Sequence, residues 1–282
     1  MSQIKIITDS TCDLTEDLIK YHEIEVVPLF VNFGESSYQD GIDLNTEVMY
    51  KKVADTNMIP KTSAASPAMF QEVFERHLEE GYEIIYTGIG QKFSATLQNA
   101  TIAKNAIDSD KIHLVDSENL SSGSGLLVLK AVKMRDEGMS AKEIVDALET
   151  LRTRVRTRFI IDTLEYLHKG GRLKAISAFV GTMLKVHPII RVVDGEMTIG
   201  KKPRGKLRNG IKILLNDVLK DEGNIDTDFV MITHSEAHEH VDFIREQLAH
   251  LGIKNIYETE AGCVISSHCG AGTIGVLYMT NS

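Results

Sequence analysis

Two short segments rich in hydroxyl side chains are the parts of this sequence best suited to holding an anion. They are Thr62-Ser63 and Ser94-Ala95-Thr96, and each comes just before a predicted helix. The free N–H groups at a helix start, together with neutral O–H donors, favour a negatively charged group. The same residue types are also the usual N-caps of helices. From spacing alone, capping is the better interpretation of either segment, and anion binding is the functional alternative.

A histidine near the end of the sequence is the third candidate. His268 stands among small residues at positions 266–272, where it could hydrogen-bond an anion or relay a proton. The adjacent Cys269 is interpreted as a packing residue, because a catalytic Cys–His pair is formed in space rather than in sequence. The other histidines show no HExxH motif or similar spacing, so we expect no metal site.

Four aspartates, Asp9, Asp13, Asp40 and Asp43, could be read as a carboxylate cluster. All four lie in turn-forming contexts, where Asp commonly accepts hydrogen bonds from nearby backbone N–H groups. We therefore interpret them as residues with a local structural role.

A run of positive charge at residues 201–208 stands out in a protein with more acidic than basic residues. Such a run is usually a solvated loop, but a local basic patch also suits the docking of an acidic partner. Arg204, Lys206 and Arg208 are the residues to which we assign that docking role.

The elements that must position these residues differ between the two halves of the chain. Strands and helices alternate in the first half, which favours a parallel, Rossmann-like sheet. In the second half Asp194-Gly195 is a strong hairpin signal, and we expect a mixed or antiparallel sheet with helices. The fold class is therefore α/β with two α/β domains, residues 1–158 and 159–282. Among the predicted elements are strands at 5–8, 25–31, 84–89 and 111–116 and helices at 45–54, 140–156 and 175–184, with Ser66 as the N-cap of a further helix.

Composition excludes several classes of protein. Hydrophobic residues make up 43% of the 282 residues and charged residues 25%, the balance of a globular protein with a sizeable core. The net charge of −9 argues against nonspecific binding of nucleic acid. Three cysteines without a CxxC pair suggest reduced thiols in a cytoplasmic protein. We find no signal peptide and no apolar run of transmembrane length.

Taken together in their order and spacing, these segments resemble the DegV family of fatty-acid-binding proteins from end to end. The residues that carry the resemblance are Thr8-Asp9-Ser10-Thr11-Cys12-Asp13-Leu14, Tyr38-Gln39-Asp40-Gly41-Ile42-Asp43, Lys61-Thr62-Ser63, Phe93-Ser94-Ala95-Thr96, Leu164-Glu165-Tyr166-Leu167-His168-Lys169-Gly170-Gly171-Arg172-Leu173 and His268.

The resemblance implies a DegV-like fold that encloses one long-chain fatty acid, such as palmitate or oleate, and needs no cofactor. It places the carboxylate at Thr62, Ser63 and Ser94, with His268 nearby and with Ala95, Thr96 and Arg172 as secondary contacts. It also implies a non-catalytic carrier: a separate ATP-binding fatty acid kinase would phosphorylate the bound carboxylate for phospholipid synthesis. We expect a monomer that makes transient contact with a membrane surface.

One alternative stays open. The same loops could bind a phosphorylated small molecule, either in an enzyme that uses His268 for phosphoryl transfer or in a regulatory subunit. Against an enzyme, the sequence lacks a P-loop, and Gly88-Ile89-Gly90 lacks the third glycine of a dinucleotide fingerprint. A hydrolase that uses Ser94 as nucleophile would lack the GxSxG elbow.

Overall fold

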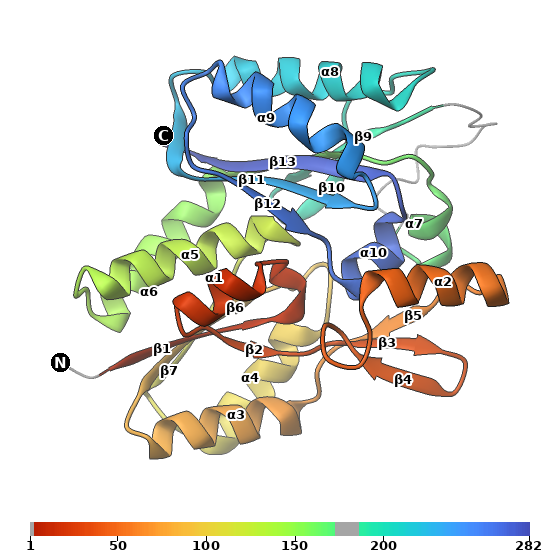
Figure 1. Cartoon of the computed structure of the whole chain (residues 1–282). Coiled ribbons are helices and arrows are strands. Elements are labelled where there is room, and N and C mark those ends of the chain that lie inside the picture. Colours follow the sequence, from red (N-terminus) through yellow and green to blue (C-terminus); the bar gives the residue numbers. More distant parts are fainter. Residues whose placement is uncertain (1–2, 173–185) are drawn as a thin grey trace.

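The structure, a computed structural model, describes residues 3–172 and 186–282. The described strands form three sheets, one parallel, one mixed and one small and antiparallel. The α/β fold class with a parallel and a mixed sheet is confirmed (Figure 1). The helix predicted at 175–184 lies outside the described residues.

The parallel sheet comes from the first half of the chain, as predicted. Its strands are paired in the order β2-β1-β6-β7. Ile84, Ile85 and Tyr86 of β6 are fully buried, because a central parallel strand has both faces covered. The bounds of the four strands are Ile4–Asp9 (β1), Glu25–Val27 (β2), Glu83–Gly88 (β6) and Ile112–Asp116 (β7).

The mixed sheet has the strand order β10-β9-β8-β13-β11-β12, and only β11 and β12 run parallel. The predicted Asp194-Gly195 turn joins β9 to β10, and both residues have positive φ, as a type I′ turn requires. Strand β8 spans the proposed boundary at residue 158 and belongs wholly to this sheet. The strands are Val155–Ile160 (β8), Ile189–Val193 (β9), Glu196–Ile199 (β10), Ile225–Ser235 (β11), Ile256–Glu260 (β12) and Thr273–Thr280 (β13).

The small antiparallel sheet is a departure from the predicted elements. It consists of β3 (Phe30–Phe33), β4 (Ser36–Gln39) and β5 (Lys61–Ser63) in the order β4-β3-β5. The strand predicted at 25–31 is broken at Pro28, which has no N–H to donate. At the next residue, the Leu29 N–H donates to the Ser10 hydroxyl, and the Leu29 carbonyl accepts from the Asp40 N–H. Thr62 and Ser63 therefore lie in an edge strand and not in a loop.

The helices separate and cover the two larger sheets in layers. From bottom to top, Figure 1 shows α3 and α4, the parallel sheet, α5 and α6, the mixed sheet, and then α8 and α9. The α-helices are Glu16–Tyr21 (α1), Thr46–Thr56 (α2), Pro67–Glu79 (α3), Thr96–Ile107 (α4), Ser122–Asp136 (α5), Ala141–Leu151 (α6), Glu165–Lys169 (α7), Leu207–Val218 (α8), Val241–Ala249 (α9) and Cys263–Cys269 (α10). Short 3-10 helices are Ser10–Cys12 (η1), Arg152–Arg154 (η2), Leu219–Asp221 (η4) and His238–His240 (η5).

Helix α5 is buried between the two larger sheets. Its residues share one hydrophobic core with Ile6 and Ile85 of the parallel sheet and Met231 and Leu277 of the mixed sheet. The helix approaches its neighbours closely at a glycine: a Cβ on Gly125 would come within 2.6 Å of the Cys12 carbonyl oxygen. The two halves of the chain therefore pack on one another through a common core.

Candidate functional site

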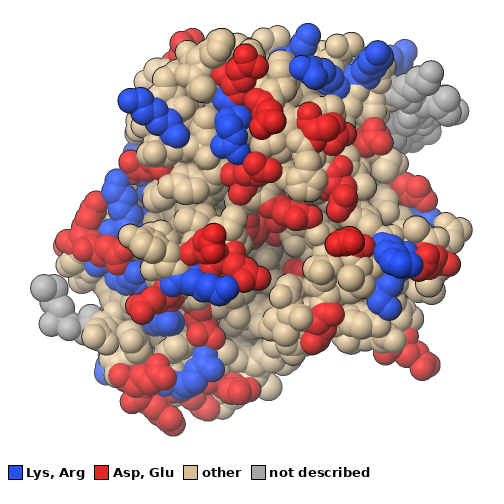
Figure 2. All heavy atoms as spheres, in the orientation of Figure 1, with Lys and Arg blue, Asp and Glu red and all other residues tan. Residues whose placement is uncertain are grey.

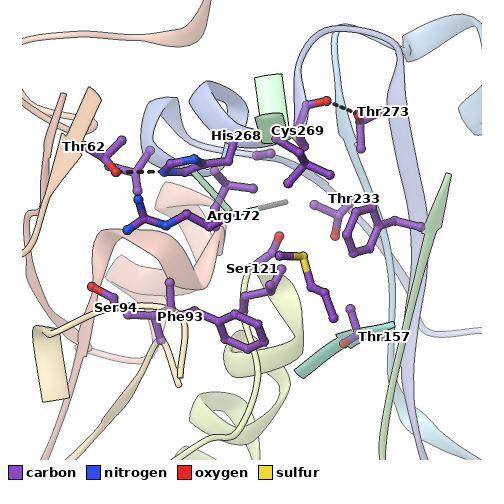
Figure 3. A pocket seen from close by; sticks show the side chains of 18 of the residues that line it. Thr62, Phe93, Ser94, Ser121, Thr157, Arg172, Thr233, His268, Cys269 and Thr273 are labelled. Atoms are coloured by element: carbon purple, nitrogen blue, oxygen red, sulfur yellow. Dashed lines mark hydrogen bonds between the residues drawn. The ribbon is translucent and has the colours of Figure 1, made fainter. Parts of the chain in front are cut away.

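A cavity lies where the carboxyl ends of β6 and β7 face the mixed sheet (Figure 3). The empty space between its lining atoms, including the open mouth, is about 920 Å³. Most of the lining is apolar. Among the apolar residues are Leu29, Ile89, Leu120, Phe159, Met197 and Leu277.

One end of the cavity brings together residues that are far apart in the sequence. Thr62 Oγ1 on β5 lies 2.8 Å from His268 Nε2 on α10. Figure 3 shows this pair beside Arg172, with Ser94 and Phe93 close below. We call Thr62, Ser94, Arg172 and His268 the polar end of the cavity.

Helix α10, which carries His268, is held in place by two buried carboxylates at its start. Asp13 accepts a hydrogen bond from the Gly262 N–H at 2.9 Å, and Asp40 accepts one from the Cys263 N–H at 2.7 Å. Burial raises the pKa of both groups, that of Asp40 to about 6. These contacts correct the local interpretation of both aspartates, because each joins segments more than 200 residues apart.

His268 is neutral at pH 7. Burial, with a smaller effect from the positive charge of Arg172, lowers its pKa to about 4. Its Nδ1 atom is buried and has no hydrogen-bond partner among the described residues. A neutral imidazole hydrogen-bonded to a hydroxyl can share in binding an anion without adding a formal charge.

This pKa gives a pH dependence of stability that can be measured. Between pH 6.5 and 4 the unfolded chain protonates His268 while the folded protein does not, so the unfolding free energy falls as pH falls. We expect the unfolding free energy of His268→Gln to fall less steeply with decreasing pH. Urea unfolding at a series of pH values measures this slope. Asp40 titrates in the same range with the opposite sign, so each variant must be compared with the wild type. Identical slopes in the two proteins would contradict the low pKa.

Ser94 is positioned by the turn between β6 and α4. Its Oγ lies 2.8 Å from Thr96 Oγ1 and accepts a hydrogen bond from the Thr96 N–H at 3.3 Å. Helix α4 begins at Thr96, and Ala95 at the N-cap position provides no side-chain cap. Ser94 therefore takes part of the capping role that the sequence suggested, and it also lines the cavity.

The other predicted site residues differ in whether they line the cavity and in how far they are exposed. Arg172 lines the cavity and donates to the Gly170 carbonyl at 2.9 Å, and within the described part of the chain it has no carboxylate partner. Ser63 also lines the cavity, but it is exposed, and its hydroxyl accepts from Asn32 at 3.1 Å. Thr96 is fully buried and Ala95 exposed. Neither is among the residues that line the cavity.

Several cavity residues were missed by sequence reasoning. Ser121, Thr157 and Thr233 place hydroxyl groups away from the polar end. Thr157 donates to Asn119 Oδ1 at 2.6 Å, and Thr233 donates to the Ser122 hydroxyl at 2.8 Å. Because these hydroxyls already have hydrogen-bond partners, this part of the cavity offers few free hydrogen-bonding groups to a ligand.

The cysteines do not supply a nucleophile. All three are buried free thiols, and burial raises their pKa values, that of Cys269 to about 12. Cys269 lines the cavity, in agreement with its interpretation as a packing residue.

The predicted docking residues are on the surface. Arg204, Lys206 and Arg208 are exposed, and Lys206 and Arg208 lie at the start of α8, which has no acidic residue in its first turn. Figure 2 shows Lys and Arg side chains over α8. Positive charge at a helix start is unfavourable for the helix, but Arg208 also packs on α9: its guanidinium carbon lies 4.5 Å from the centre of the Phe243 ring.

Comparison with known proteins identifies the family. The sequence profile of a family described as "uncharacterised protein, DegV family" matches residues 3–281. The chain belongs to the DegV family. A DegV domain-containing protein of Clostridium acetobutylicum is 37% identical over 279 residues, which are 99% of each chain. Another, from Caldanaerobacter subterraneus subsp. tengcongensis, is 38% identical over 283 residues, again 99% of each.

Solved structures of fatty-acid-binding proteins, among them two DegV proteins, share the whole fold. A fatty-acid-binding DegV protein of Thermus thermophilus superposes with a TM-score of 0.89 at 31% identity, over 99% of this chain and 100% of that one. The fatty acid binding protein DegV of Bacillus subtilis gives 0.88 at 27% identity over the full length of both chains. A stearic acid-binding protein of Eubacterium ventriosum gives 0.88 at 26% identity over 98% of each chain.

None of the helices in the described part of this DegV chain combines the length and the hydropathy needed to cross a bilayer.

Proposed function

We propose that this protein binds one long-chain fatty acid, with the carboxylate at the polar end of the cavity and the acyl chain along its apolar walls. The observation that carries the proposal is the distribution of polarity: Thr62, Ser94, Arg172 and His268 meet at one end of a largely apolar cavity. The fatty-acid binding of DegV proteins with the same fold supports it.

The energetics suit such a ligand. Burying the methylenes of a sixteen-carbon chain at about 0.8 kcal/mol each contributes at most roughly 11 kcal/mol before the cost of association. The polar end therefore needs only to orient and solvate the carboxylate. Arg172 supplies one positive charge for it, and the hydroxyls with neutral His268 supply hydrogen bonds.

We further propose that the bound carboxylate is presented to a separate ATP-dependent kinase for phospholipid synthesis. Ser63 is exposed, and Thr62 next to it is only partly buried, which supports a polar end within reach of an outside partner. Arg204, Lys206 and Arg208 form the docking surface in this proposal. The chain itself would remain a carrier, and purified protein with ATP and palmitate should form no acyl phosphate. ATP turnover that is lost in His268→Ala would favour the enzyme alternative instead.

Native mass spectrometry of the purified protein tests the binding. We expect a fatty-acid mass that delipidation removes and added palmitate restores. Ser94→Ala should weaken palmitate binding by about ten- to a hundredfold, because a hydrogen bond to a charged group contributes about 1.5–3 kcal/mol. Ser37→Ala, an exposed serine in β4, is the matched control and should bind like the wild type.

Two results would count against the proposal. If the delipidated protein shows no measurable affinity for palmitate or oleate, the fatty-acid function is wrong. If it instead binds a phosphorylated small molecule in a manner sensitive to Ser94→Ala, the alternative function is favoured.

A further inference from the structure

Three side chains of metal-ligating type lie together at the edge of the mixed sheet, beside the cavity. They are His234 at the end of β11, His238 in η5 and Glu258 in β12, and one ligand atom from each lies within 4.8 Å of the others. His234 Nε2 is 3.5 Å from Glu258 Oε1. Ligand atoms around a tetrahedral zinc ion, each about 2.1 Å from the metal, are about 3.4 Å apart. Small movements of the two exposed side chains, His238 and Glu258, would therefore close the group around an ion.

The backbone fixes the three groups from two sides. Strands β11 and β12 are parallel neighbours, with Glu258 opposite Ile232 and His234 opposite Glu260. His234 and Glu258 are therefore diagonal neighbours on the same face of the sheet. Glu236 has a φ of 48°, in the left-handed region, and the chain turns there so that the ring of His238 stands over that of His234. The two ring centroids are 4.2 Å apart.

Arg245 orients the carboxylate of this group. Its Nη2 atom donates to Glu258 Oε2 at 2.9 Å, and its Nη1 atom donates to the Ile256 carbonyl. Oxygen Oε1 of Glu258 is the one that faces His234. Metal ligands are commonly held by such a neighbouring hydrogen bond, which fixes their direction.

His234 is the buried member of the group. Its side chain is only 1% exposed, and its Nε2 atom is the ring nitrogen that faces Glu258. Acidic side chains nearby add a field that attracts cations: Glu236 and Glu239 lie on the same turn and Glu260 on the same strand as Glu258. Figure 2 shows Asp and Glu side chains across the middle of this face.

We propose that His234, His238 and Glu258 bind one divalent transition-metal ion. Two imidazoles and one carboxylate are a donor set that suits zinc, with a fourth position left open to water. The ion would join the β11–η5 turn to β12. His234 also lines the cavity, so the ion would hold part of the cavity wall. The sequence search for HExxH missed this group because its ligands come from a strand end, a turn and the next strand.

Calorimetric titration of Zn²⁺ into delipidated, chelator-treated protein tests the proposal. We expect one ion per chain, and with Co²⁺ the visible absorption of a tetrahedral site. His238→Ala should raise the Kd for Zn²⁺ at least tenfold and abolish the Co²⁺ absorption. His238 is exposed, so this change should leave the fold intact. His250→Ala, an exposed histidine at the end of α9, is the matched control and should bind Zn²⁺ with unchanged affinity.

Thermal unfolding with and without Zn²⁺ tests the ligand role independently, with Glu258→Gln as a second variant. Zn²⁺ should raise the melting temperature of the wild type and of His250→Ala, but not that of His238→Ala or Glu258→Gln. Absence of Zn²⁺ binding in the wild type would overturn the proposal. Equal Zn²⁺ affinity in the wild type, His238→Ala and Glu258→Gln would overturn it as well. Because the protein is free of lipid in both measurements, neither result depends on the fatty-acid function.

Discussion

Replacing Asp9 with alanine is expected to lower the unfolding free energy by about 4 kcal/mol. Asp9 is fully buried at the end of β1. One of its oxygens accepts hydrogen bonds from the N–H and hydroxyl of Thr11, and the other accepts from the Tyr86 hydroxyl at 2.8 Å and the Ile89 N–H at 2.9 Å. The alanine variant would leave all four donors without this acceptor inside the protein.

Urea unfolding at pH 7 measures this loss, with Asp43→Ala as the control. Asp43 is exposed and, among the described residues, accepts one hydrogen bond, from the Gln39 N–H, so its removal should change stability by less than about 1 kcal/mol. Ile89 also begins the turn that leads to Ser94, and folded Asp9→Ala should therefore bind palmitate less tightly. Similar losses of stability in the two variants would show that Asp9 does not have this role.

Filling the cavity with a tryptophan at position 265 is expected to have the largest effect on ligand binding. Ile265 lies on α10, lines the cavity and is partly exposed, so a larger side chain there takes up ligand space without entering a sheet. If the indole displaces about four methylenes of the acyl chain, some 3 kcal/mol of apolar burial is lost, and the Kd rises on the order of a hundredfold.

Titration of delipidated Ile265→Trp with palmitate measures this effect, and Ile102→Trp is the matched control. Ile102 lies on α4 with 49% of its surface exposed and is not among the residues that line the cavity. The control should bind palmitate like the wild type. Wild-type affinity in Ile265→Trp, with its melting temperature unchanged, would show that the acyl chain does not occupy this cavity.

Local pattern was enough to predict the principal elements of the fold. Buried β-branched runs such as Ile84-Ile85 indicate parallel strands, and Asp194-Gly195 indicates a hairpin, because each depends on neighbouring residues alone. Strand β5 was missed because neighbouring residues alone do not indicate it. Its sequence, Lys61-Thr62-Ser63, has neither apolar alternation nor length, and it is a strand because it pairs with β3.

Residue types alone point to Thr62, Ser94 and His268 as candidates for binding an anion. Only the family resemblance places them in one candidate site and adds Arg172. Nothing in the spacing of Thr62 and His268 indicates that they share a hydrogen bond across 206 positions. Likewise, the role of Asp9 depends on contacts with Tyr86 and Ile89 that no local rule contains. Which apolar side chains line a cavity depends on how the two larger sheets face one another, and this information lies in the packing.

The position of α5 between the two larger sheets has a consequence for how the chain unfolds. By its sheets the protein has two units, but both draw on the core that α5 fills. Separating them would expose apolar surface on both faces of that helix, so each sheet loses the core on its inner face when the other melts. We therefore regard the chain as a single cooperative folding unit, in which both halves unfold in one transition with one free energy of unfolding.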